Sequence, residues 1–266
     1  MLSPKAEQLM QNYFNLPFPG VDNVRCPYFN NTKLKQRGQL RVLVGKGTPA
    51  EIVEEAKIIS IQYHAGLFDK AGHCCLHGEH GDNKILAEDI RKFLINNNLG
   101  IDCSGFVSQV LYQHFLETAH VKLFKKMFIV APTNFLRWLI SQLRPIENIS
   151  VKHYADNRNT EIITKIDQIK PADLIVMLET GPRNNRNHIV LITDHTDDVI
   201  KYAAARAWTS DGQYGHGVTK GEIRIMKPKG SLLDQEWIES DKKNLENETY
   251  LEAKNAKILE IRRIKL

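Results

Sequence analysis

The sequence is poor in cysteine and has no uninterrupted apolar run long enough to cross a membrane. It has four cysteines in 266 residues, too few and too scattered for a disulfide scaffold, which favours a reducing compartment. Its most apolar stretch, 123–143, is interrupted by lysine, proline, asparagine and arginine, so we expect no membrane span. The first 20 residues lack the pattern of a signal peptide. We therefore expect a cytoplasmic protein, while export by an unconventional or phage-type route stays open.

Acidic residues are missing from one segment, although the composition as a whole is that of a globular protein. Hydrophobic residues make up 42% and charged residues 25%, with a net charge of +5, which favours anionic partners but selects none. Between Glu117 and Glu147 every charged residue is basic. This stretch is either a binding surface for a phosphate-rich polymer or a solvated helix face. Because it lacks interleaved aromatic residues, we expect no nucleic-acid partner.

Helical patterns come first in the chain and strand-like runs follow. Thr48, Pro49 and Glu51 form a helix-start pattern. We expect helices over residues 49–62, 86–96, 103–119 and 133–143, and strands over 40–44, 173–178, 188–193, 199–204, 222–226 and 257–264. The Lys/Glu-rich piece at 239–257 is expected to be a solvated helix or linker. This order predicts an α+β fold with a mainly antiparallel sheet.

The segment GIDCSGFV, residues 100–107, places a cysteine where a loop ends and an amphipathic helix begins. The positive end of a helix dipole favours the thiolate form of Cys103, which is the nucleophilic form. Gly105 would let a substrate approach the sulfur. Asp102 can cap the helix, but its charge would oppose thiolate formation if it lay close to the sulfur. The alternative is a buried, unreactive cysteine.

A nucleophilic cysteine needs a base, and His188 has the best context among the 10 histidines. A polar turn at 184–187 precedes the apolar run HIVLI, residues 188–192. A histidine that begins a core strand is held rigidly at the sheet edge, which suits a general base. The upstream segment 169–176 is a turn that enters a strand, so the two runs can pair as a hairpin. The alternative is a structural histidine at a strand end.

Taken together, DCSGFV, PADLIVM and HIVLI resemble, in this order, the DCSGFV, PGDLV and HVGIY pattern of NlpC-type cell-wall cysteine peptidases. The resemblance covers about residues 50–225. It implies a papain-like core in which N-terminal helices pack on the sheet and the nucleophile begins a helix. The implied organisation is an N-terminal extension at 1–48, a catalytic domain at 49–228 with an insertion at 64–99, and a C-terminal extension at 229–266 packed on the same domain.

The resemblance also implies roles for individual residues. Cys103 would attack an amide carbonyl, and His188 would take the thiol proton and later protonate the leaving amine. Ser104 would lie near the developing oxyanion, and Tyr63 resembles the tyrosine that the family carries upstream of the cysteine. The substrate would be a peptidoglycan stem peptide or a similar short peptide, and no metal or organic cofactor is required.

The chain departs from the family pattern at the position of the polar residue that orients the catalytic imidazole in this family. Its expected position falls near Ala204. Tyr202 could take the place of this polar residue if the alignment with the family were shifted along the strand. Asp194, His195 or His216 could also fold back to the site. Without an orienting group the enzyme would be weak or silent, so a peptide-binding module is the alternative function.

Two further segments carry candidate residues. The segment HCCLHGEH, residues 73–80, offers ligand types for zinc in His73, Cys74, Cys75, His77 and His80. Because adjacent cysteines match no common ligand spacing, it is either a metal site or a polar loop that rims a cleft. The loop at 206–217 contains Arg206 and Trp208, which suit recognition of charged peptide groups, although an ordinary glycine-rich connection fits as well.

Overall fold

The computed structural model describes residues 1–30, 40–64, 66–68, 86–129, 143–181 and 183–266. Their contacts divide the chain into two compact units. The sheet unit comprises residues 1–7, 103–204 and 219–266, and the second unit comprises residues 8–102 and 205–218. Among the described residues, none of the helices is long and apolar enough to cross a membrane.

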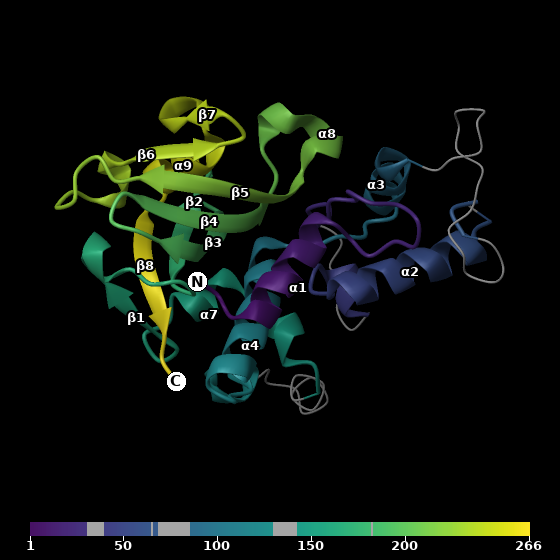
Figure 1. Ribbon diagram of the computed structural model, residues 1–266, viewed down its shortest axis with the longest axis horizontal. Helices are drawn as coiled ribbons and strands as arrows, with labels where there is room; N and C mark the ends of the chain where they lie inside the picture. The colour runs from purple at the N-terminus through teal and green to yellow at the C-terminus, as the bar shows by residue number, and fades with distance from the viewer. Residues whose placement is uncertain (31–39, 65, 69–85, 130–142, 182) are drawn as a thin grey trace. The chain divides into compact units, whose positions relative to one another are not determined.

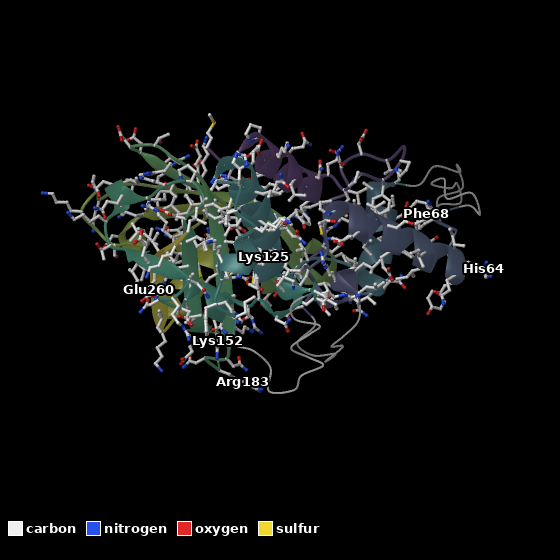
Figure 2. The ribbon with its side chains drawn as sticks, turned by 90° about the horizontal axis from the view of Figure 1, so that it is seen from below. His64, Phe68, Lys125, Lys152, Arg183 and Glu260 are labelled. Atoms are coloured by element: carbon white, nitrogen blue, oxygen red, sulfur yellow. The ribbon has the colours of Figure 1, made fainter. Side chains whose placement is uncertain are left out.

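The fold is α+β, as predicted, and is dominated by one eight-stranded antiparallel sheet (Figure 1). The strand order is β1-β8-β2-β3-β4-β5-β6-β7. The strands are β1 (Thr160–Ile163), β2 (Leu174–Thr180), β3 (Arg186–His195), β4 (Val199–Arg206), β5 (Gly217–Arg224), β6 (Glu236–Glu239), β7 (Lys242–Lys243) and β8 (Ile258–Ile264). β2 and β3 form the expected hairpin, in which Met177 pairs with His188. Arg183 is exposed in their connection, where Figure 2 labels its side chain.

The helices among the described residues are α1 (Pro4–Phe14), α2 (Pro49–Gln62), α3 (Ala87–Asn96), α4 (Cys103–Thr118), α5 (Leu123–Lys126), α7 (Val151–Tyr154), α8 (Gly212–Gly215) and α9 (Glu248–Asn255). The helices predicted at 49–62, 86–96 and 103–119 correspond to α2, α3 and α4, which begin at the predicted residue or one residue after it. At the start of α2 the Thr48 hydroxyl accepts from the Glu51 amide, and the Glu51 carboxylate accepts from the Thr48 amide. This capping box confirms the predicted helix start.

An apolar cluster covers one face of the sheet. Met177 of β2, Val190 of β3 and Tyr202 of β4 share it with Tyr250 and Ala253 of α9. Because side chains alternate along a strand, Ile189 and Leu191 point to the other face, where both are fully buried. The sheet is therefore covered by apolar packing on both faces along β3.

The C-terminal strand is an interior part of the sheet, because β8 lies between β1 and β2 (Figure 1). Asp173, the acidic residue of PADLIVM, accepts from the Lys170 amide at 2.8 Å and from two nitrogens of Arg263 on β8 at 2.8 Å each. Asp173 is buried. This motif residue therefore closes the turn before β2 and anchors the last strand.

Several local predictions were wrong. The expected strand at 40–44 is a 3-10 helix at Arg41–Val44, which ends at Gly45 in the left-handed conformation with φ +73°. Its amide groups bond locally, from Leu43 to Leu40 and from Gly45 to Val42, so the segment needs no strand partner.

Other boundaries differ because tertiary packing overrides local pattern. β3 begins at Arg186, two residues before His188, since its pairing with β2 extends to Thr180. The segment 239–257 contains a helix, α9, as predicted. This helix is not wholly solvated, because it buries Tyr250 and Ala253 in the apolar cluster. Of the basic stretch, Lys125, which Figure 2 labels, and Lys126 are exposed, while Leu123 is buried. The helix expected at 133–143 falls almost wholly outside the described residues.

Candidate active site

The predicted site residues belong to both units. The sheet unit holds Cys103, Ser104, His188 and Tyr202. The second unit holds Tyr63, Asp102, Arg206 and Trp208.

Cys103 is the first residue of α4, and this helix packs against β3. The cysteine is 6% exposed. The Ser104 hydroxyl lies 3.5 Å from the Ile149 carbonyl, and the hydroxyls of Ser108 and Tyr154 are 2.6 Å apart, which ties α4 to α7. The end of the helix that carries the thiol is therefore fixed by neighbouring elements within its own unit.

His188 is the third residue of β3 and is 5% exposed. Its pairing with Met177, together with strand alternation, places it on the face of the sheet that carries Met177 and Val190. β3, the strand against which the cysteine helix α4 packs, therefore carries a buried imidazole. Catalysis by this pair requires the imidazole to meet the thiol near the beginning of β3.

Tyr202, the shifted substitute for the orienting residue, is engaged elsewhere. Its hydroxyl donates to the Glu239 carboxylate at 2.8 Å, and its ring packs on Trp237. The Thr249 hydroxyl donates to the same carboxylate oxygen at 3.1 Å. Gly221 makes room for the ring, since a β-carbon there would lie 2.2 Å from Tyr202 Cζ. Tyr202 thus belongs to a buried polar network on the α9 face.

The other candidates for the orienting role also have described contacts. Asp194 forms an ion pair with Lys201, and His195 Nδ1 lies 2.9 Å from the Ile169 carbonyl. Both follow His188 along β3 by six or seven residues, which corresponds to about 20 Å, too far to orient its imidazole. In the second unit, His216 Nε2 lies 2.8 Å from the Trp208 carbonyl. Ala204 itself is fully buried and offers no side-chain polar group.

In the second unit, Asp102 has a partner that sequence reasoning missed. Lys46 Nζ lies 2.8 Å from Asp102 Oδ1, and Lys46 is 4% exposed. The Asp102 carboxylate is thus compensated by a buried ammonium group. The two residues are 56 positions apart, and no motif links them, so this pair could not be predicted from the sequence.

Arg206 and Trp208 are buried, and they contact each other. The Arg206 guanidinium lies 3.6 Å above the centre of the Trp208 ring and forms an ion pair with Asp211. Arg91 of α3 donates to three backbone carbonyls, of Arg25, Tyr214 and His216. Burial and the nearby Arg25 charge lower the pKa of Arg91 to about 10, so it remains charged at neutral pH. These contacts order the loop at 206–217. The role of Arg206 and Trp208 in substrate binding stays a prediction.

The remaining predictions concern Tyr63, the cysteines and the metal site. Tyr63 follows α2 and is 68% exposed. Cys26 is a free, fully buried thiol, and burial raises its pKa well above the usual value. Residues 73–80 lie outside the described residues. Within the described part of the chain, no group of three or more His, Cys, Asp or Glu side chains could hold a metal ion.

No family model, curated protein or solved structure matches this chain.

Proposed function

We propose that this protein is a cysteine amidase or endopeptidase that hydrolyses an amide bond in peptidoglycan stem peptides or related short peptides. The observation that carries the proposal is that Cys103 begins a helix packed against the strand that contains His188, with both residues in one compact unit. A helix N-terminus favours thiolate, and a neighbouring imidazole can accept its proton. The papain-like arrangement implied by the sequence motifs is part of this proposal.

The proposed reaction has two steps. In acylation, His188 takes the proton of Cys103, the sulfur attacks the amide carbonyl, and the imidazolium gives its proton to the leaving amine. In deacylation, His188 removes a proton from water, the hydroxide attacks the thioester, and the carboxylic acid leaves as the thiol reforms. Backbone amides at the start of α4 would stabilise the oxyanion in both steps.

The test is hydrolysis of purified muropeptides, followed by mass spectrometry. We expect wild-type protein to release a new amine and a new carboxylate, Cys103→Ala to release neither, and His188→Gln to be slower by about 10²–10⁴-fold. Lys257→Met is the matched control, because it removes one charge from an exposed ion pair with Glu179. Turnover by Cys103→Ala at the wild-type rate would refute the proposal.

A second candidate function is a catalytically silent peptide-binding module. The observation that favours it is the buried Ala204 at the expected orienting position, with Tyr202 held by Glu239. An imidazole without an orienting group loses much of its catalytic effect. Muropeptide binding by both wild-type protein and Cys103→Ala, with no turnover by either, would support this function over the first.

The two free cysteines among the described residues, Cys26 and Cys103, agree with a reducing compartment. We therefore propose that the enzyme acts in the cytoplasm on wall fragments or other short peptides.

A further inference from the structure

The sheet has two edge strands, β1 and β7, and they expose different side chains. β7 is two residues long, and both residues are lysines, which discourages the addition of another strand. β1, which lies beside β8 (Figure 1), is four residues long and exposes Glu161 and Ile162. Ile162 is 45% exposed. Within the described part of the chain, β8 is the one strand that pairs with β1, so the other side of β1 is open to a further strand.

The hydrogen bonds between β1 and β8 show which main-chain groups of β1 face outward. The Lys265 amide donates to the Asn159 carbonyl at 2.9 Å, in the same register as the β1–β8 pairs. In an antiparallel pair, residues that exchange hydrogen bonds alternate with residues that do not. The odd-numbered residues from Asn159 onwards therefore direct their main-chain groups towards β8, whereas Ile162 and Thr164 direct theirs away from it.

The extended backbone continues beyond the last residue of β1. Lys165 has φ −120° and ψ 138°, and both Thr164 and Lys165 are exposed. The edge therefore presents segment 161–165, whose outward main-chain groups belong to Ile162 and Thr164. These two residues lie symmetrically about Ile163. A second copy of the segment can therefore pair with the first about a twofold axis at Ile163, with Ile162 of each copy bonded to Thr164 of the other.

The same register places opposite charges across from each other. With the axis at Ile163, Glu161 of one copy lies opposite Lys165 of the other, and the symmetry repeats this pair. Both pairs are at positions without main-chain hydrogen bonds, where opposite Cα atoms are about 4.5 Å apart and side chains are closest. An axis at Ile162 would place Glu161 opposite an isoleucine instead. An axis at Thr164 would place it opposite an aspartate.

We propose that the β1 edge is a self-association surface, at which two copies of this chain pair antiparallel about Ile163. A second copy is the occupant because the charges of segment 161–165 are complementary to themselves in the register that the main chain requires. The twofold dimer uses the β1 edge of both copies, and the edges that remain are the lysine-bearing β7 strands. This inference does not depend on the proposed chemistry of Cys103.

The test is analytical ultracentrifugation of the full chain at low ionic strength over a range of protein concentrations. We expect the wild-type protein to dimerise reversibly. Lys165→Glu creates two Glu–Glu pairs and Glu161→Lys creates two Lys–Lys pairs, so each variant alone should raise the dimer dissociation constant by about tenfold or more. In an equimolar mixture of the two variants, both cross-strand pairs are again Lys–Glu. The mixture should therefore form heterodimers with an affinity close to that of the wild-type dimer.

Lys229→Glu is the matched control, because it makes the same change of charge at an exposed residue between β5 and β6. If Glu161→Lys does not fold, the comparison of Lys165→Glu with Lys229→Glu decides. A wild-type protein that stays monomeric at every concentration would overturn the inference, and so would a dimer that Lys165→Glu leaves unchanged. Open-ended assemblies that Lys242→Glu disrupts would indicate pairing of β1 with β7 and would also contradict the twofold interface.

Discussion

At the scale of single residues, the sheet unit contains a buried polar network that engages Tyr202, the substitute considered for the orienting residue. Glu239 is 1% exposed and accepts hydrogen bonds from the hydroxyls of Tyr202 and Thr249. A buried carboxylate is stable only with such donors. The Tyr202 ring that carries one donor lies over Gly221, which leaves no room for a β-carbon. Position 202 therefore serves the fold.

We predict that Gly221→Ala lowers the free energy of unfolding by about 1–3 kcal/mol, because the new methyl group overlaps the Tyr202 ring. Tyr202→Leu alone removes a donor from buried Glu239 and should cost about 1–3 kcal/mol. Urea denaturation of both single variants and of the double variant measures these costs. Because leucine vacates the space that alanine needs, the double variant should cost less than the sum. Strict additivity would show that the two side chains do not meet.

At the scale of elements, the last strand depends on a residue 90 positions earlier. Arg263 of β8 donates to both carboxylate oxygens of Asp173 and to the Gln168 carbonyl. The hydrogen bonds to Asp173 raise the pKa of Arg263. Two parallel N–H···O bonds between a guanidinium and a carboxylate are among the stronger polar contacts in proteins. This pair thus ties the turn before β2 to the strand that separates β1 from β2.

We predict that Asp173→Ala lowers the free energy of unfolding by about 3 kcal/mol, because it leaves Arg263 and the Lys170 amide without their buried acceptor. Glu179→Ala, which removes the exposed partner of Lys257, should cost less than about 1 kcal/mol. Chemical denaturation gives both values. Equal costs for the two variants would show that Asp173 does not anchor β8.

At the scale of the whole molecule, the sequence predicted what depends on local pattern. The 3–4 spacing of apolar residues after Cys103 located α4, and the Thr48 pattern located the start of α2. The apolar runs on either side of a polar turn predicted the β2–β3 hairpin. Each of these features is specified by residues within a few positions of one another.

What the sequence did not predict depends on residues far apart in the chain. The place of β8 between β1 and β2 follows from pairing between residues that are 80 to 104 positions apart, for which no local pattern exists. Lys46 and Asp102 form an ion pair only in the folded chain. The short run at 40–44 has strand composition but ends at a left-handed glycine, and its local hydrogen bonds decided its conformation. The residue that would orient His188 is the main part of the site that neither motif nor strand register supplied.

We propose above that Cys103 and His188 act as a nucleophile and its base. The most direct measurement is the pH profile of Cys103 alkylation in wild-type protein and in His188→Gln, read on the peptide that contains Cys103. If the two side chains form a thiolate–imidazolium pair, the wild-type rate rises well below pH 8.5, the usual pKa of cysteine, and His188→Gln shifts this rise to about pH 8–9. Identical profiles for the two proteins would contradict the account.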